Sequence, residues 1–443
     1  MSDRNRDDYF DLDNFDETID SRDYRRRQAA RNNRSSSYGN RRPSSRRPSS
    51  RRPNSRRRNR TRLRNRIVIL AGGAAILIFL IILISLMFRG CSKKEPVEIS
   101  TDTKTQQQSG QETATDAAAP ANAQTGDPLS TSFFMTPVID DDNSAGTDFG
   151  TVYGWHGSAY ELFGGSDDSA KTYADTVNSL ASKLSGINVY SIIVPNHTEY
   201  GLPQRLKDGS VVQSNSQADN IKKAYESMSG VTPVNAYNYL AEHNKEYTYF
   251  HSDHHWTGLG AYYAYKAFAD TLKLTPLDLK QCTEKQIDGF TGTFSDTATG
   301  LDPDSVHYWQ FPYSVSMELH YASGSTENYD SPYFENATAG SNTYGVFIFG
   351  DNPLTILKSQ SENAEPNRKI AVVKESYGNA FVPYLTQNFS EVHVMDLRTF
   401  RANSDVDLAT YCKNNGITDF LFLNGIMSAN TQGQLDNITA MFD

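Results

Sequence analysis

The stretch KIAVVKESYGNAFVPYL, residues 369–385, contains the pattern that decides the fold. Its first part, Lys369–Val373, is an apolar, β-branched run without polar alternation, which is typical of a strand buried on both faces. Its second part, Asn379–Leu385, is predicted to be a helix. A buried strand that leads directly into a helix indicates an α/β protein with a mostly parallel sheet.

The same alternation of strand and helix patterns recurs on both sides of this stretch. Strands are expected at 188–194, 246–250, 391–395 and 419–423, and helices at 170–184, 217–228, 258–272, 406–414 and from 431 onward. This order predicts a three-layer α/β/α domain in which helices cover both faces of the sheet. Residues 289–365 are rich in Gly, Thr and Tyr, and we expect them to form a β-rich insertion.

Residues 1–66 differ in charge from the rest of the chain. They hold 21 Arg and nine acidic residues, a formal charge of +12, although the whole chain carries −9. After an acidic start, the motifs RRPSS, RRPSS and RRPNS follow one another from residue 41. Because this segment has almost no apolar surface to bury, we expect a disordered tail. It is either a topology signal or a site for anionic lipid head groups; nucleic acid is not an expected partner, since no folded reader domain accompanies it.

A run of 22 residues, Ile67–Phe88, has Ser85 as its one polar side chain. As a helix it would be roughly 33 Å long, enough to cross a hydrocarbon core of about 30 Å. Arginines crowd its N-terminal side, so the positive-inside rule places the N-terminus in the cytoplasm and residues 89–443 outside. The sequence therefore predicts a single-pass anchor in the cell membrane, a flexible extracytoplasmic linker at 89–149 and a folded domain at 150–443.

Three cysteines are too few for a disulfide framework. Cys91 follows the predicted span directly, but the charge of Arg89 interrupts the small and apolar positions that a lipidation site needs. Cys282 and Cys412 could pair in an oxidising exterior, and the sequence alone leaves that pairing open.

The second informative stretch is YFHSDHHWTGLGAYYAY, residues 249–265, in which His251, Asp253, His254 and His255 fall within five residues. Side chains i and i+2 of an extended segment point the same way, so Asp253 can orient His255 while His254 faces elsewhere. The stretch follows a predicted strand. We therefore expect it at the carboxyl edge of the sheet, where ligands bind in such folds.

Ser376 follows the strand of the first stretch, at a turn where Gly378 leaves space around it. A serine hydroxyl is a weak nucleophile, so it needs a histidine base, and that histidine needs an orienting carboxylate. Ser376, His255 and Asp253 supply these three types at predicted strand ends. They are the predicted catalytic residues.

Further polar groups at the same edge are candidates for an oxyanion hole or a substrate contact. The N–H of Ser376 is the first candidate donor, and the side chains of Asn379 and Asn424 are further ones. Asn196 and His197 close another predicted strand and could contact substrate. For these side chains, a role in a turn, cap or loop stays open as the alternative.

A metal site is another interpretation of the histidine cluster. His251, Asp253 and His255 alternate, so they could face one way and hold zinc together with a water. Against this, ligands on one short strand bracket a metal poorly, and Ser376 would then have no role. We expect no metal and, because ester chemistry needs none, no cofactor.

The stretch 249–265 resembles the signature of the DHHW family of bacterial surface proteins. That family belongs with the SGNH-hydrolase-like proteins that include alginate O-acetyltransferases. The similarity covers most of residues 150–443 and includes IVPNH at 193–197 and ESYG at 375–378. As departures, Glu375 stands before the serine where relatives often have another small or acidic residue, and no carbohydrate-binding module is recognisable.

The resemblance implies that Asp253 orients, His255 is the base and Ser376 attacks, with His254 and Trp256 as parts of the motif. The order Asp, His, Ser is permuted relative to ordinary SGNH hydrolases, in which the serine comes first. The implied activity is that of a serine acyl-esterase or O-acetyltransferase acting on a cell-surface or secreted glycan. A transferase would need a multi-pass membrane O-acyltransferase as partner. A catalytically inactive module that binds glycan or protein, or a metal-binding domain, is the alternative.

Overall fold

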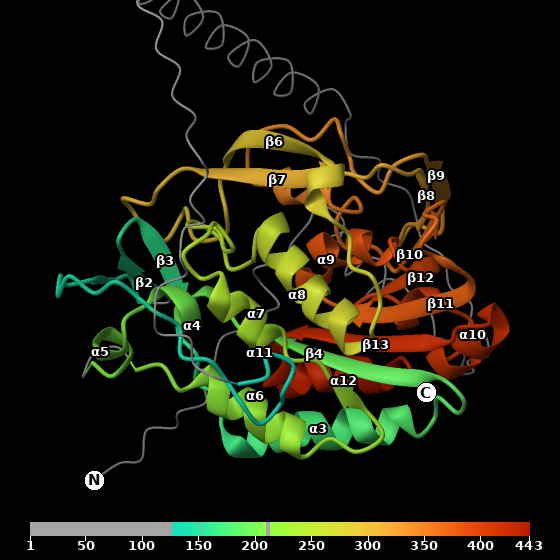
Figure 1. The fold of residues 1–443 in the computed structure, drawn as a ribbon, viewed down its shortest axis with the longest axis horizontal. Helices are drawn as coiled ribbons and strands as arrows, with labels where there is room; N and C mark the ends of the chain where they lie inside the picture. Colours follow the sequence, from blue (N-terminus) through green and yellow to red (C-terminus); the bar gives the residue numbers. More distant parts are fainter. Residues whose placement is uncertain (1–125, 151, 210–212) are drawn as a thin grey trace, which may run out of the picture. The chain divides into compact units, whose positions relative to one another are not determined.

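The computed structural model describes residues 126–150, 152–209 and 213–443, which are coloured in Figure 1. The predicted tail at 1–66 and the predicted membrane span at 67–88 lie outside these residues. Within the described ranges, no helix is both long and apolar enough to cross a membrane.

The compact unit begins before residue 150, where the sequence placed the start of the domain. Its described residues run from Gly126 to Asp443. The Met135 N–H donates a hydrogen bond to Asn238 Oδ1 at 2.8 Å, and Asn238 Nδ2 donates to the Phe133 carbonyl at 2.9 Å. The last part of the predicted linker therefore packs against the domain.

An eight-stranded sheet forms the centre of this unit (Figure 1). In spatial order its strands are β5 (Thr232–Pro233), β4 (Asn188–Val194), β13 (Asp419–Gly425), β11 (Glu365–Lys374), β12 (Phe389–Asp396), β10 (Leu354–Ser359), β8 (Val315–His320) and β9 (Thr326–Tyr329). The first five are mutually parallel, and the last three continue the sheet in antiparallel pairs. The prediction of an α/β fold with a mostly parallel sheet is thus confirmed.

Continuous apolar runs place the parallel strands at the centre of the sheet. All seven residues of β13 are buried, and so are the last five of β11, Ile370–Lys374. The register pairs Lys374 with Leu423 of β13 and with Asp396 of β12. These strands therefore end at one edge of the sheet, and Ser376 lies just beyond it.

Helices cover both faces of the sheet (Figure 1). On one face lie α3 (Asp167–Ala181), α6 (Gln217–Glu226), α11 (Ile426–Ala429) and α12 (Gln432–Ala440). On the other face lie α7 (Ala236–Glu242), α8 (Gly258–Thr271) and α9 (Tyr377–Leu385). Further helices are α4 (His197–Gly201), α5 (Gln204–Lys207) and α10 (Leu408–Asn415), and a 3-10 turn, η4, spans Thr343–Val346.

Side-chain caps define where the long helices begin. The Ser166 hydroxyl accepts a hydrogen bond from the Ser169 N–H at the start of α3, at 3.2 Å. The Thr257 hydroxyl does the same for the Gly260 N–H at the start of α8, at 3.3 Å. Helix α8 therefore begins two residues after Trp256, with Thr257 as its N-cap.

The strand expected at 246–250 is absent, and this prediction was wrong. Tyr249 forms an isolated bridge to Trp256. The Phe250 N–H bonds to the His255 carbonyl at 3.3 Å, so the segment folds back on itself instead of entering the sheet. Here local contacts outweigh the β-propensity of the aromatic and Thr residues.

The insertion expected at 289–365 is β-rich, but its strands have two destinations. Strands β8, β9 and β10 extend the central sheet. Strand β7 (Asp304–Gln310) instead pairs with β6 (Thr283–Phe290) in a separate antiparallel hairpin. A further small sheet consists of β1 (Thr147–Asp148), β2 (Val152–Trp155) and β3 (Ser158–Glu161).

The two cysteines of the folded unit do not pair. Cys412 is buried in α10, Cys282 is half-buried before β6, and both are free thiols. The pairing that the sequence left open is therefore not present.

Candidate active site

The loop that carries Asp253 and His255 is held by a carboxylate from the β6–β7 hairpin. Asp304 Oδ1 accepts a hydrogen bond from the His251 N–H at 2.9 Å, and its Oδ2 accepts from the Ser252 N–H at 2.7 Å and the Ser252 hydroxyl at 2.5 Å. Asp304 is almost fully buried. Its two oxygens thus fix the backbone immediately before Asp253.

The serine sits in the turn between β11 and α9. Glu375 bridges this turn to the next strand, because its Oε2 accepts from the Tyr377 N–H at 2.9 Å and its Oε1 from the Gly425 N–H at 2.5 Å. A side chain at position 378 would lie 2.6 Å from the Lys374 Cβ, so this position requires glycine. Together these contacts fix the path of the chain around Ser376.

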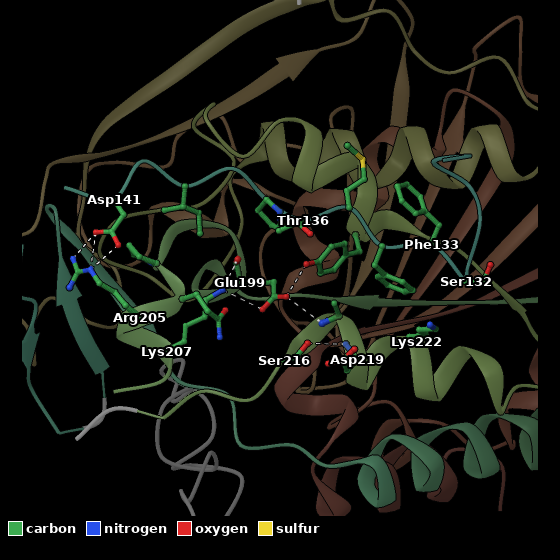
Figure 2. Close-up of a pocket in the computed structure, with 18 residues that line it drawn as sticks. Ser132, Phe133, Thr136, Asp141, Glu199, Arg205, Lys207, Ser216, Asp219 and Lys222 are labelled. Carbon is green, nitrogen blue, oxygen red and sulfur yellow. Dashed lines mark hydrogen bonds and ion pairs between the residues drawn. The ribbon is translucent and has the colours of Figure 1, made fainter. Parts of the chain in front are cut away.

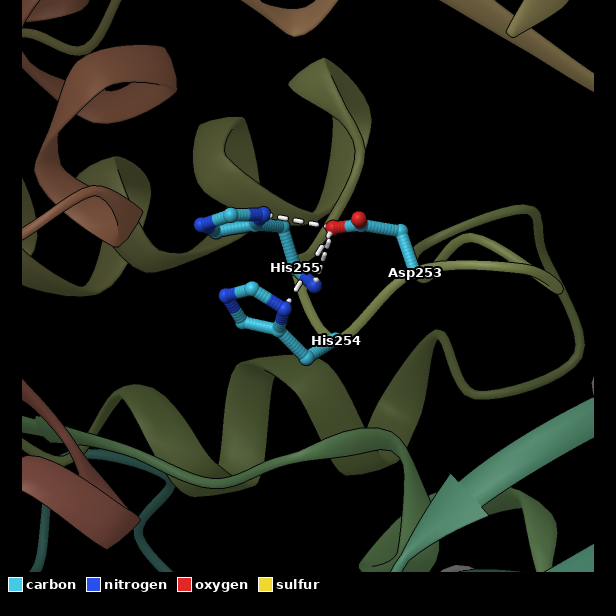
Figure 3. A group of neighbouring side chains, drawn as sticks. All are labelled: Asp253, His254 and His255. Carbon is cyan, nitrogen blue, oxygen red and sulfur yellow. Dashed lines mark hydrogen bonds and ion pairs between the residues drawn. The ribbon is translucent and has the colours of Figure 1, made fainter. Parts of the chain in front are cut away.

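These two segments bring the three predicted catalytic residues together. Asp253 Oδ1 lies 2.5 Å from His255 Nδ1 (Figure 3), and His255 Nε2 lies 2.6 Å from Ser376 Oγ. The three side chains are 2 to 7 % exposed. The arrangement is a continuous hydrogen-bonded chain from carboxylate to imidazole to hydroxyl.

Asp253 is ionised in this arrangement despite its burial. Burial raises the pKa of the carboxyl, but the charges of His255 and His254 and the hydrogen bonds to it outweigh burial and hold the pKa well below its usual range. Among these bonds, Oδ2 accepts from the Thr293 N–H at 2.8 Å. A negative charge is therefore available to orient His255 and to stabilise its protonated form.

His254 does not face away from the pair, contrary to the expectation from an extended segment. Its ring centroid lies 3.8 Å from that of His255, with an angle of 37° between the planes. Its Nδ1 lies 2.9 Å from the Thr293 hydroxyl and 3.9 Å from Asp253 Oδ1. The backbone here is a series of bends, in which the i, i+2 rule of strands does not hold.

Trp256 links the loop to the start of α9. Its Nε1 donates to the Tyr377 carbonyl at 2.9 Å, and the Tyr377 hydroxyl donates to the His254 carbonyl in return. Trp256 is fully buried and stacks on Phe381 of α9. These contacts bridge 121 residues of sequence and set the loop against the serine turn.

Comparison with known proteins shows the family of this chain. The model of the DHHW family matches residues 135–395. The chain belongs to the DHHW family. Among solved structures, a DHHW family protein from Eubacterium siraeum is 29 % identical, with a TM-score of 0.59 over 67 % of this chain and 97 % of that one.

The present chain also shares its fold with Bacillus cereus PatB1, to which it is 18 % identical. The TM-score is 0.53, over 68 % of this chain and 100 % of that one. PatB1 with a sulfonyl adduct gives a TM-score of 0.51 at the same identity, over 62 % and 94 % of the two chains. No curated protein matches the sequence.

The asparagines expected near the serine have different surroundings in the DHHW fold. Asn379 Nδ2 donates to Asp351 Oδ1 at 2.9 Å, so this amide is directed to a carboxylate. Asn424 Oδ1 accepts from the Tyr173 hydroxyl at 3.1 Å, and its Nδ2 has no hydrogen-bond partner among the described residues. Among the described residues, the Asn424 Nδ2 therefore has no acceptor, whereas the Asn379 Nδ2 is bound to a carboxylate.

Asn196 and His197 serve the local structure. Asn196 caps α4, because its Oδ1 accepts from the Thr198 N–H at 3.2 Å, while its Nδ2 donates to the Glu161 carbonyl. His197 stacks on Tyr249, with ring centroids 5.3 Å apart and planes 6° apart. Burial, followed by the nearby His251, lowers the pKa of His197 to about 3, so its ring is neutral.

A buried ion cluster lies beneath the serine turn. Lys374 Nζ contacts Asp351 Oδ1 at 2.6 Å and Asp396 Oδ2 at 3.1 Å, and Arg398 contacts the second oxygen of Asp351 at 2.7 Å. Lys374 is 1 % exposed. Burial opposes its charge, yet the two carboxylates outweigh burial and raise the pKa of Lys374.

The donor set of the histidine cluster suits a triad better than a metal. Asp253, His254 and His255 each offer a ligand atom, and these atoms lie within 4.8 Å of one another. However, both ring nitrogens of His255 and both oxygens of Asp253 already have hydrogen-bond partners. The Nδ1 of His251 also has a partner, the Ser158 hydroxyl, at 2.7 Å.

A pocket of about 690 Å³ lies elsewhere in the unit (Figure 2). It is lined by the 132–141 segment and by residues of α4, α5 and α6, and none of the catalytic candidates lines it. At its centre, Glu199 accepts from the Tyr237 hydroxyl at 2.8 Å and lies 3.7 Å from Lys207 Nζ. Its buried polar groups thus satisfy one another.

Sequence reasoning missed three residues of the site: Asp304, Tyr344 and Thr293. Asp304 and Thr293 lie in the insertion, which was described only as β-rich. Tyr344, in η4, stacks on His255 with ring centroids 4.3 Å apart and planes 14° apart. No local signal could have found them, because each contact joins segments 32 or more residues apart.

Proposed function

We propose that this DHHW protein is a serine acyl-esterase or O-acetyltransferase that removes or transfers an acyl group, acetyl by preference, on a cell-surface or secreted glycan. The observation that carries the proposal is the hydrogen-bonded chain from Asp253 through His255 to Ser376. The acyl group and the glycan come from the resemblance to the acetyltransferase relatives. No cofactor is required.

In the first half-reaction, Ser376 Oγ attacks the acyl carbon of an ester while its proton passes to His255 Nε2. The tetrahedral intermediate collapses, the bond from the acyl carbon to the leaving oxygen breaks, and His255 returns the proton to the leaving alcohol. Ser376 then carries the acyl group as an ester. Asp253 stabilises the imidazolium that exists between the two proton transfers.

In the second half-reaction, His255 takes a proton from water or from a glycan hydroxyl, whose oxygen attacks the acyl-serine. His255 then protonates Ser376 Oγ as it leaves, so the enzyme returns to its starting state. Because the Tyr377 N–H is bonded to Glu375, the Ser376 N–H is the backbone donor that we assign to the oxyanion.

In this proposal the catalytic site lies outside the cytoplasm, and segment 67–88 anchors the protein in the membrane. A transferase of this kind needs an acyl donor from across the membrane. A multi-pass O-acyltransferase is the partner that would supply it.

Active-site labelling of the full-length protein in detergent tests the proposal. We expect phenylmethylsulfonyl fluoride to modify Ser376, as mapped by mass spectrometry, and a chromogenic acetyl ester to be hydrolysed. Ser376→Ala should lower hydrolysis at least about 10³-fold. Ser361→Ala is the matched control, because Ser361 is equally buried but bonds to the Gln387 carbonyl.

The proposal would be refuted if Ser376 were not labelled and Ser376→Ala hydrolysed the ester as fast as the wild type. An inactive binding module predicts that neither labelling nor hydrolysis occurs. A metal-binding domain predicts instead that zinc co-purifies and that a chelator lowers the thermal stability.

A further inference from the structure

The His255 ring is covered on both faces. The His254 ring lies 3.8 Å from it and the Tyr344 ring 4.3 Å from it, centroid to centroid. Two rings cannot share one face of an imidazole at these separations, so they lie on opposite faces. The Tyr344 plane is within 14° of the His255 plane, which is the closer alignment of the two.

Tyr344 contacts the nucleophile turn as well as the histidine. Its hydroxyl donates a hydrogen bond to the Ser376 carbonyl at 3.3 Å. Burial raises the pKa of this hydroxyl well above its usual value, so it remains a neutral donor. One side chain therefore touches two of the three catalytic residues.

The segment that carries Tyr344 follows a strained course. Ile348 and Phe349 have φ angles of 44° and 59°, and Gly350 follows with 81°. Left-handed backbone is unfavourable for residues with a Cβ and worst for a β-branched one. Such strain persists where the surroundings enforce it, often beside functional sites. Ile348 is fully buried. Asp351, the residue after Gly350, belongs to the ion cluster because it contacts Lys374.

We propose that Tyr344 is a positioning residue for His255: its ring keeps the imidazole in line between Asp253 and Ser376 and stabilises the imidazolium that forms when His255 takes the serine proton. A ring face attracts a cation within about 6 Å of its centroid, and the attraction is strongest when the pair is desolvated. This inference rests on the proposed function. It adds a fourth side chain, from a segment that local sequence patterns did not connect with the site.

Measurements of kcat and KM for acetyl-ester hydrolysis by full-length variants test the role of Tyr344. Tyr344→Leu removes the ring, and we expect kcat to fall roughly ten- to thirty-fold with KM within about two-fold, because the ring faces His255. Tyr344→Phe keeps the ring and should restore kcat to within about three-fold of the wild type. A residue that only filled space or bound substrate would not show this pattern of kcat loss and rescue.

Tyr333→Leu is the matched control. Tyr333 is buried in the same aromatic region, but its ring contacts are with Tyr308, Phe311 and Phe347 and not with His255. It should lose thermal stability as Tyr344→Leu does and keep its kcat within about two-fold. If Tyr344→Leu does not fold, Tyr344→Met, which fills the space without a ring, decides the question.

An unchanged kcat in Tyr344→Leu or Tyr344→Met, or equal losses in the Phe and Leu variants, overturns the inference. The rate of Ser376 sulfonylation separates the two proposals. If the wild-type protein is not labelled, the proposed function fails; if it is labelled and Tyr344→Leu reacts equally fast, only the role of Tyr344 fails.

Discussion

Two buried polar clusters flank the turn between β11 and α9, and they are built differently. On one side, Asp253, His255 and Ser376 form a chain of hydrogen bonds that ends in a hydroxyl group. On the other side, Lys374 pairs with two carboxylates in a closed ion cluster. The first leaves one group able to react, whereas the second leaves none. We infer that the first serves chemistry and the second holds the turn in place.

The largest expected effect concerns the hydrogen-bonded chain. His255→Gln keeps a polar side chain of similar volume but removes the base, so kcat should fall about 10³- to 10⁴-fold. The free energy of unfolding should fall by about 1–3 kcal/mol, less than the activity loss in the same units, because Gln can still donate to Asp253 but cannot stack between His254 and Tyr344. Ester hydrolysis and urea denaturation measure the two quantities. A stability loss as large as the activity loss would contradict the division between the clusters.

The ion cluster should give the opposite result. Lys374→Met removes the fully buried cation of the cluster and leaves only the less buried Arg398 in contact with Asp351 and Asp396, and we expect a loss of about 3 kcal/mol in the free energy of unfolding. Lys369→Met is the control on the same strand, because its partner Glu391 is partly exposed. The free energy of unfolding of Lys369→Met should fall by only about 0–1 kcal/mol. Equal losses in the two variants, measured by urea denaturation, would show that the buried cluster has no special role.

A smaller effect is expected from acid. The Lys374 and Arg398 charges outweigh burial and hold the pKa of Asp351 below its usual range, and Asp253 is lowered in the same direction. A carboxyl with a depressed folded-state pKa stabilises the fold above its unfolded pKa of about 3.9, and this contribution is lost as the pH falls through the folded-state pKa. The free energy of unfolding should therefore decrease below about pH 4.

Asp351→Asn and Asp253→Asn should each flatten this acid dependence, as measured by urea denaturation between pH 3 and pH 7. Asp405→Asn is the control, since Asp405 is an exposed residue in the loop before α10. A variant with an unchanged slope would show that its carboxyl is not one of the groups responsible.

Much of the fold was predictable because its central strands are buried on both faces. The strand at 188–194 matches β4, and the strand at 419–423 lies within β13. Helix boundaries shifted by a few residues, as at α3, where Ser166 and not the apolar pattern sets the start. The prediction of a strand at 246–250 was wrong. Its aromatic and Thr residues have the composition of a strand, but the segment forms hydrogen bonds within its own loop.

The candidate triad was predictable for a different reason. Asp253 and His255 are close in sequence, and Ser376 follows an apolar strand at a turn with a required glycine. The supporting residues Asp304, Thr293 and Tyr344 could not be predicted, because they reach the site from the insertion at 289–365. Glu375 was noted as a departure from the relatives, but only the structure showed that it bridges the serine turn to Gly425.

The sequence by itself determined the class of the fold and the chemical types available at its edge, because burial on both faces and the Ser, His and Asp side chains are properties of local stretches. The tertiary structure alone decided that His255 lies between Asp253 and Ser376, that His254 and Tyr344 cover its two faces, and that Lys374 is buried between carboxylates. Apart from the contacts among residues 253–255, these contacts join residues far apart in the chain. Only the packing of the β6–β7 hairpin and the 343–351 segment against the sheet edge brings them together.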